Sequence, residues 1–341
     1  MSESNEVHKP TGNPTTKTER HRIIINATHL IPLYERPVDS KISEEVIAKE
    51  SLPTEIPLLG SSIIEDFIRM KIQDGVASPD QISEAFADEN IPEQVAQYLD
   101  QVRDYSRSLN WENIFTPDDV KQVQTNVCQE MALLGISSEK ISKIANMDIV
   151  VTDSPGVSFP TNEGVSVSQL QIVRNALDYI RVYGDSIPIE QIISAYIKST
   201  MSHELGHKID YALDNISSTI PFDKTWGENN YEKPSERFAE YWGRLGSIED
   251  QKIAQKISVM HLAKVNQLWN SINSYNQTHE NKVDLSGIFR SIGSKIEKSS
   301  NTMSLFDARL HLYSGNVAEN YALPYSRETI ISAIKTKSTT N

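Results

Sequence analysis

Two histidines with a glutamate between them constrain this chain more than any other feature. Residues 201–210 read Met-Ser-His-Glu-Leu-Gly-His-Lys-Ile-Asp. Residues four apart on a helix project from the same face, so the imidazoles of His203 and His207 can reach one metal ion. Glu204 then falls beside that ion, where a base acting on a water molecule belongs. The motif therefore predicts a metal site on a helix.

The flanking sequence predicts that helix. Ser186-Ile187-Pro188 is typical of a helix start, and apolar residues then recur at steps of three and four. We expect a helix over residues 188–215, with an apolar stripe and a polar seam that carries the histidines and Asp210. A glycine inside a helix costs about 1 kcal/mol relative to alanine. Gly206 therefore indicates that another segment passes close to the backbone there.

A second helix is predicted to supply the third ligand. Residues 235–242 read Ser-Glu-Arg-Phe-Ala-Glu-Tyr-Trp, in which Glu236 and Glu240 are four apart and share a face. A solvated helix face is the ordinary explanation of such a pair. Because the metal site still lacks a ligand, we expect Glu236 to bind the ion and Glu240 to lie behind it. Asp210, one turn beyond His207, is expected to accept the other N–H of an imidazole and fix its tautomer.

This set of residues fits a hydrolytic zinc centre. His-Glu-x-x-His is typical of zinc-dependent hydrolases, and a catalytic zinc keeps three protein ligands and one position for water. Glu204 would take a proton from that water and later pass it to the leaving amine. A neighbouring donor usually helps the metal to hold the oxyanion. Tyr231 is the candidate for that donor, with Tyr321 and Tyr325 as rivals.

The two motifs together resemble those of a known family. His203-Glu204-Leu205-Gly206-His207 followed by Glu236-x-Phe-Ala-Glu240 resembles gluzincin metallopeptidases of the anthrax lethal factor type, and clostridial Pro-Pro endopeptidases share the pattern. The resemblance covers residues 147–245. It implies one zinc ion per chain on the two histidines and Glu236, a catalytic Glu204 and a supporting role for Glu240.

Two positions set this chain apart from relatives of that pattern. The family carries a tyrosine seven residues before the third ligand, where this chain has Asn229, so Tyr231 would act from a shifted loop. Metzincins need a glycine at position 210 and a ligand at 213, where this chain has Asp210 and Leu213. The metzincin class is therefore excluded.

The chain as a whole is expected to be α+β and mostly α. Residues 1–20 are predicted to be a disordered tail and residues 21–146 a helical region. Residues 147–341 are predicted to form a zincin-like metallopeptidase domain with a small sheet, the active-site helix, the glutamate helix and a helical C-terminal part. Helices are expected at residues 61–72, 78–87, 91–109, 116–134, 137–145, 248–275, 285–298 and 326–335, and strands at 148–152 and 164–168.

Two segments of the expected catalytic domain are less regular in pattern. Residues 171–183 fit a strand or a helix. Residues 164–168 alternate with period two, as an edge or half-buried strand does, and are expected to hold a substrate backbone by strand addition.

Composition excludes several classes of protein. Acidic residues outnumber basic ones, 46 to 33, and no basic stripe is present, so nucleic acid is not expected as a partner. No apolar run is long enough for a membrane helix, and the N-terminus lacks the features of a secretory signal. We expect a cytoplasmic protein, or one exported without a signal peptide as delivered effectors are.

The remaining candidate ligands are expected to be inert. Cys128, the single cysteine, excludes an intramolecular disulfide and is expected to be a small core residue. His8 and His21 lie in or beside the tail, and His261 and His279 are expected to be solvated.

The function expected from these observations is that of a zinc-dependent endopeptidase acting on a protein or peptide. One alternative keeps the fold and the zinc in a catalytically inactive regulatory or interaction protein. Another is a helical interaction protein in which the motif is fortuitous. The sequence specifies neither the substrate nor the oligomeric state.

Overall fold

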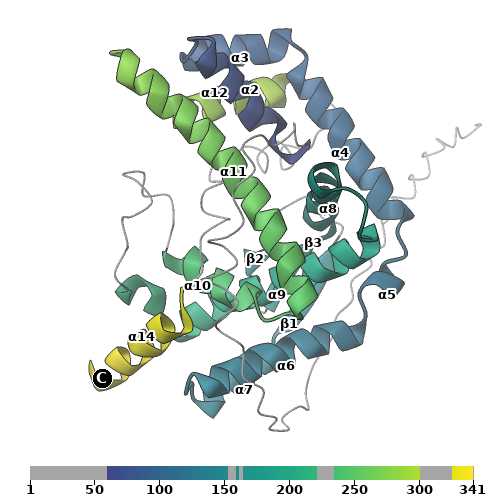
Figure 1. Ribbon diagram of the computed structural model, residues 1–341, viewed down its shortest axis with the longest axis vertical. Helices are drawn as coiled ribbons and strands as arrows, with labels where there is room; N and C mark the ends of the chain where they lie inside the picture. The colour runs from purple at the N-terminus through teal and green to yellow at the C-terminus, as the bar shows by residue number, and fades with distance from the viewer. Residues whose placement is uncertain (1–59, 153–158, 161–163, 221–233, 300–324, 341) are drawn as a thin grey trace, which may run out of the picture.

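The computed structural model describes residues 60–152, 159–160, 164–220, 234–299 and 325–340 (Figure 1). These residues are mostly helical and include a small sheet, which confirms the predicted mostly α member of the α+β class. Within these ranges, no helix combines the length and the apolar character that crossing a membrane requires.

Helices precede the sheet at nearly the predicted positions. Proline stands in the first turn of three of them, and at the last of these three Thr116 and Asp119 also form a capping box. These local signals explain why the boundaries were predictable. In chain order the elements are η1 (Gly60–Ser62), α2 (Ile63–Gln73), α3 (Pro79–Asp88), α4 (Ile91–Ser108), α5 (Trp111–Ile114), α6 (Pro117–Leu133) and α7 (Ser138–Ala145).

The sheet has the order β1-β3-β2, from β1 (Asp148–Thr152), β2 (Phe159–Pro160) and β3 (Gly164–Ser168). β1 runs parallel to β3, and β2 pairs with β3 antiparallel. The prediction that residues 164–168 form an edge or half-buried strand is wrong, because β3 is central and all five of its residues are buried. A Cβ at Gly164 would lie 1.7 Å from the carbonyl oxygen of Asp148, so the close strand pairing requires glycine there.

Helices again follow the sheet. Residues 171–183, for which strand and helix both remained open, are helical as part of α8. The elements are α8 (Gln169–Tyr183), α9 (Ile189–Ala212), η2 (Ile216–Thr219), α10 (Pro234–Gly243), α11 (Ile248–Thr278), α12 (Leu285–Ser299) and α14 (Arg327–Thr340).

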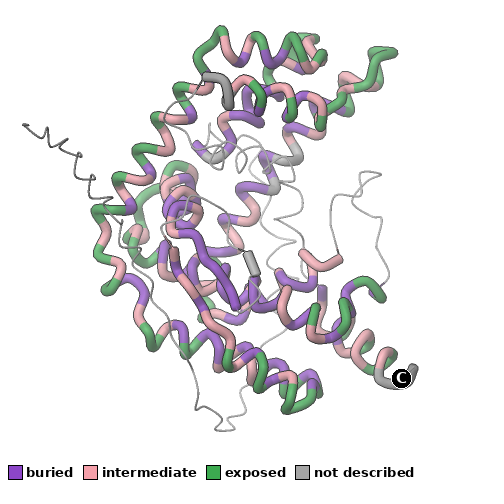
Figure 2. Tube along the Cα trace, turned by 180° about the vertical axis from the view of Figure 1, so that it is seen from behind, coloured by how far each residue is buried: buried purple, intermediate pink, exposed green. Residues whose placement is uncertain are grey.

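The metal-motif helix α9 lies at the centre of the molecule. It packs against α6, α8, α10, α11 and β3, and Figure 2 shows the buried residues gathered in the central segments while exposed residues follow the outer helices. Polar side chains of α9 such as Thr200, Ser202 and Glu204 are buried along with the apolar ones. The predicted apolar stripe is buried, but the seam is not a solvated face: His203 and His207 are half-buried and Asp210 is buried, because other elements cover most of α9.

Two apolar cores stabilise the described chain. The larger core joins the end of α4, α6, the sheet, α8, α9, α10 and the first half of α11. The smaller core joins α2, α3, the start of α4, the second half of α11 and α12. Each core combines segments from before and after residue 146. The predicted boundary at that residue therefore does not coincide with the boundary between the cores.

A polar contact marks the place where α11 passes between the cores. Nε2 of His261 donates to Oδ1 of Asn175 at 3.1 Å, and Nδ2 of Asn175 donates to the Tyr196 hydroxyl at 2.9 Å. Burial, with a contribution from the positive charge of Arg174, lowers the pKa of His261 to about 3. The prediction of a solvated His261 is wrong because α8 covers that face of α11, whereas His279 is exposed as predicted.

The backbones of α9 and α10 approach each other closely at Gly206. A Cβ built on Gly206 would lie 2.8 Å from both Cα of Ala239 and Cδ1 of Trp242. The predicted close approach is confirmed, and the segment that approaches is the glutamate helix. Gly206 therefore sets the distance between the two helices that carry the candidate ligands.

Gly206→Ala should lower the free energy of unfolding by about 1–3 kcal/mol, since the new methyl group would overlap backbone atoms of α10. Gly243→Ala is the matched control: its Cβ would meet its nearest neighbours at 3.4 Å, so the change should stay within about 1 kcal/mol. Urea unfolding followed by circular dichroism measures both. Equal destabilisation by the two variants would contradict the role given to Gly206.

Candidate metal centre

The three predicted ligands come together between α9 and α10. Among the described residues, one group could hold a metal ion: His203, His207 and Glu236, with one ligand atom from each residue lying within 4.8 Å of the others. The two histidines come from α9, and the glutamate comes from the first turn of α10. All three side chains are half-buried, with 16–18% of each exposed.

The distances within this group fit a tetrahedral zinc ion. Oε2 of Glu236 lies 3.3 Å from Nε2 of His203 and 3.5 Å from Nε2 of His207. Ligand atoms placed about 2.1 Å from a tetrahedral ion are about 3.4 Å apart. One carboxylate oxygen thus stands at the separation from both imidazoles that a shared ion requires.

Glu240 lies behind this group, as predicted from its spacing. Its Oε2 is 3.2 Å from Nδ1 of His203, on the side of the ring away from Glu236. A proton on Nδ1 would be held by this contact, which leaves the lone pair of Nε2 for a metal ion. Glu240 therefore fixes the tautomer of His203 that metal binding needs.

Glu204 is buried beside the two histidines, with 7% of its surface exposed. Burial raises the pKa of its carboxyl; the positive charges of His203 and His207 partly offset this, and the negative charge of Glu236 adds to it. A carboxylate with a raised pKa is a stronger base than a solvated one. Glu204 thus has the environment of a proton acceptor.

Charge coupling holds the ligand group together in the absence of a metal ion. Burial alone would lower the pKa of His203, but hydrogen bonds with Glu236 and Glu240 raise it well above the ordinary value of 6.5. Burial would likewise raise the pKa of Glu236, but hydrogen bonds from His203 and His207 lower it to about 2. In the absence of a metal ion, the two carboxylates therefore favour the protonated form of His203.

Asp210 has a different role from the predicted one. Its Oδ1 accepts from the backbone N–H of Ser217 at 2.9 Å, and its Oδ2 accepts from the Ser217 hydroxyl at 2.6 Å. The predicted contact with an imidazole is not formed, because η2 folds back against the end of α9 and occupies both oxygens. Asp210 thus stabilises the turn after the helix.

The described part of the chain does not include an assigned oxyanion donor. Tyr231 and Tyr321 lie outside the described residues. Tyr325 is buried, its ring lies 4.7 Å from the guanidinium of Arg237, and its backbone N–H donates to the Arg237 carbonyl. The oxyanion donor is therefore not assigned to any one of the three tyrosines.

Several residues that position the metal helices were missed by the sequence analysis. Ser199 donates to the carbonyl of Gly243 at 2.8 Å and ties α9 to the end of α10. Nζ of Lys337 on α14 donates to the carbonyls of Leu213 and Asp214 at 2.8 Å, just after α9 ends. Neither contact leaves a spacing signal, because each joins segments far apart in the sequence.

α6 also contacts the helices around the candidate site through side chains that lie far apart in the sequence. Buried Glu130 accepts a hydrogen bond from the Tyr241 hydroxyl on α10 and forms an ion pair with Arg327 on α14 at 2.9 Å. Burial raises the pKa of Tyr241, and the negative charge of Glu130 raises it further. The glutamate helix is thus held from behind by two other helices.

A scan against protein-family models, a search of curated proteins and a search of solved structures each found no match to this chain. The geometry of the site therefore carries the functional argument.

Zinc binding should release a proton from His203. Because the ion and the proton compete for Nε2, the apparent zinc affinity should rise about tenfold per pH unit until the pH reaches the raised pKa of His203. Calorimetric titration at pH 7 in two buffers of different ionisation enthalpy counts the protons. Zinc binding without proton release would contradict the charge state assigned to His203.

Glu236→Ala should weaken zinc binding more than Glu240→Ala. The first change removes a ligand, whereas the second removes a contact that orients one, a loss of about 10–100-fold. Competition with a chelating dye measures both affinities. Glu190→Gln, an exposed change in the first turn of α9, should leave the affinity unchanged. The opposite order of the two glutamates would exchange their assignments.

Proposed function

We propose that this chain is a zinc-dependent endopeptidase of the gluzincin type. The observation that carries the proposal is that the Glu236 oxygen lies from both His203 and His207 at the separation expected of ligands to one tetrahedral zinc ion, with buried Glu204 beside them. Four features thus coincide: two imidazoles, a carboxylate, a base and an orienting glutamate. A fortuitous motif has no reason to produce this combination.

The arrangement of elements supports a zincin-like fold for this domain. The small sheet packs on α9, and α10 crosses α9 closely enough to deliver Glu236 to the two histidines. β2 is an end strand of the sheet and also packs against α9. Since central β3 has neighbours on both sides, we assign the substrate-strand role expected of residues 164–168 to β2 instead.

The chain's own residues account for the movement of protons during peptide hydrolysis. A zinc ion bound to the three ligands would polarise a water molecule and the scissile carbonyl. Glu204 accepts a proton from the attacking water and then donates it to the leaving amine, so the carboxylate is regenerated in each cycle. Glu240 keeps the ring of His203 in place while the charge at the site changes.

The carboxylate of Glu204 gives the direct test. Glu204→Gln should keep one zinc ion per chain and the native circular dichroism spectrum but slow cleavage by a factor of about 10²–10⁴. The measurement is proteomic profiling of new peptide N-termini, wild type against variant, with metal content determined on the same samples.

Glu190→Gln on the same helix is the control for a lost carboxylate and should cleave as the wild type does. Cleavage at the wild-type rate by Glu204→Gln would contradict the role of Glu204 as the general base. Stoichiometric zinc without cleavage by the wild type would instead favour a binding or regulatory protein, and absence of zinc would overturn both readings.

A further inference from the structure

A pocket of about 460 Å³ lies between the end of α2 and the second half of α11. This pocket belongs to the smaller core, to which no ligand of the candidate metal centre belongs. Figure 1 shows α2 and α12 at one end of the molecule and α9 and α10 toward the other. Its volume falls within the range typical of ligand sites. The pocket is therefore a separate feature.

The described lining residues are mostly polar and include no acidic side chain. They include primary amides from both helices, hydroxyls from α11, one arginine and one histidine, and Ile72 is the one aliphatic side chain among them. The chain has 46 acidic residues and a net charge of −13, so a lining of this size without a described acidic side chain differs from the composition of the chain as a whole. Such a lining suits a ligand that offers many hydrogen bonds and is negative or neutral, and it disfavours an apolar one.

Arg69 supplies the positive charge. Its neighbour Asp66 is already neutralised, because Nζ of buried Lys264 lies 3.1 and 3.0 Å from the two Asp66 oxygens. Nε of Arg69 is 3.5 Å from Asp66, and Nη1 donates to Oε1 of Gln73 at 3.1 Å. In the described chain, no hydrogen bond to Nη2 is formed. Asp66 thus faces two cations, Lys264 and Arg69, and the Nη2 group of Arg69 has donors suited to a ligand carboxylate.

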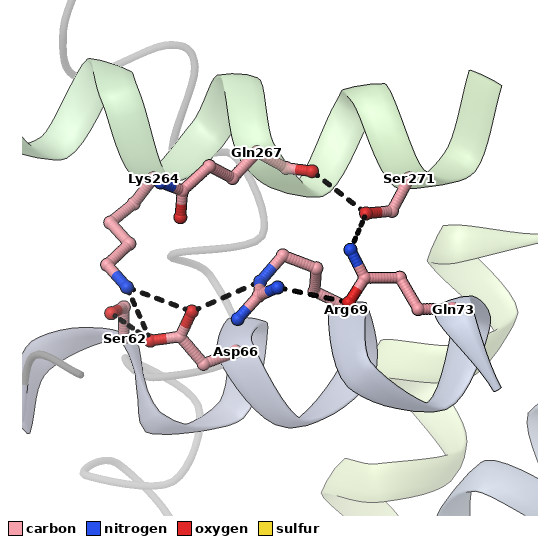
Figure 3. A network of polar contacts seen from close by, with 7 residues as sticks. All are labelled: Ser62, Asp66, Arg69, Gln73, Lys264, Gln267 and Ser271. Atoms are coloured by element: carbon pink, nitrogen blue, oxygen red, sulfur yellow. Dashed lines mark hydrogen bonds and ion pairs between the residues drawn. The ribbon is translucent and has the colours of Figure 1, made fainter. Parts of the chain in front are cut away.

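The polar groups around Arg69 are held in fixed orientations. Nε2 of Gln73 donates to the Ser271 hydroxyl at 3.1 Å, and that hydroxyl donates to the Gln267 carbonyl at 3.1 Å. Figure 3 shows this series of contacts running from α2 to α11, with Arg69 and Lys264 on either side of Asp66. A preorganised site loses less entropy on binding than a flexible one.

An aromatic pair forms another wall of the pocket. The rings of Tyr275 and His279 stack with their centroids 3.8 Å apart and their planes 1° from parallel. Nδ1 of His279 lies 3.0 Å from the Tyr275 carbonyl and 2.9 Å from the Thr278 hydroxyl, which leaves Nε2 as the ring nitrogen without a partner among the described residues. The pair thus adds a flat surface and a second hydrogen-bonding group.

We propose that this pocket binds a short peptide segment through one carboxylate, which pairs with Arg69. The side-chain amides of Gln267 and Asn270 each offer a donor and an acceptor, as the peptide groups of such a segment require. Because Lys264 and Arg69 share the one Asp66 carboxylate, the site suits one further acidic side chain. The proposal concerns binding alone and does not rest on the endopeptidase activity.

The test is a titration of the full-length chain with the peptide acetyl-Gly-Ser-Glu-Ser-Gly-amide, followed by ligand-observed NMR. A peptide with Gln in place of Glu is the first control and needs no protein variant. We expect saturable binding of the Glu peptide and at least tenfold weaker binding of the Gln peptide. Absence of saturable binding, or equal binding of the two peptides, overturns the proposal.

Protein variants locate the site. Arg69→Gln should weaken binding of the Glu peptide at least tenfold, and Arg69→Lys should fall between it and the wild type because it keeps the charge without the forked donors. Arg107→Gln, an exposed arginine on α4, is the matched control and should bind as the wild type does. If Arg69→Gln binds the Glu peptide as tightly as the wild type does, the peptide does not bind at this pocket. If inorganic phosphate binds in an Arg69-dependent way and the peptide does not bind, the pocket takes an anion and not a peptide segment.

Discussion

The structure depends on the contact between the backbones of α9 and α10 at Gly206. The histidines and Glu236 belong to different helices, and a separation of 3.3–3.5 Å between their ligand atoms requires the helices to lie unusually close. Only a residue without a side chain leaves room for Ala239 and Trp242 at that point. A steric requirement at one glycine thus fixes the electrostatics of the site, because His203, Glu236 and Glu240 shift one another's protonation only at these distances.

Much of this arrangement could be predicted because its signals are local. Prolines and capping residues marked the helix starts before the sheet, and the spacing of His203 and His207 placed two imidazoles on one face. Gly206 indicated that another segment packs close to the helix backbone, because a glycine inside a helix is otherwise unfavourable. The pair Glu236 and Glu240 was identified from its spacing combined with a missing ligand. In each case the physical cause lies within a few residues of the feature.

The predictions that proved wrong concern contacts between segments that are far apart in the sequence. Gly-Val-Ser-Val-Ser alternates as an edge strand does, but Ser166 and Ser168 are small enough to be buried in a central strand. His261 lies on a helix face that reads as polar, and only the position of Asn175 on α8 shows that the face is covered. From its spacing alone, Asp210 could accept a hydrogen bond from an imidazole or from Ser217. The turn after α9 brings Ser217 against the carboxylate, so the bond to Ser217 forms. Sequence periodicity does not record which element covers a face.

Glu130 has a consequence for the order in which the protein assembles during synthesis. This carboxylate is 1% exposed, yet its partner Tyr241 lies 111 residues later and Arg327 is near the end of the chain. At translation rates of about 5–20 residues per second, Glu130 waits on the order of 10–40 s for Arg327. During that interval the Glu130 carboxylate lacks its cationic partner, and burying an unpaired charge is costly. The final packing of α6, α10 and α14 therefore follows synthesis of Arg327, and the candidate ligand group on α9 and α10 is fully supported only after that step.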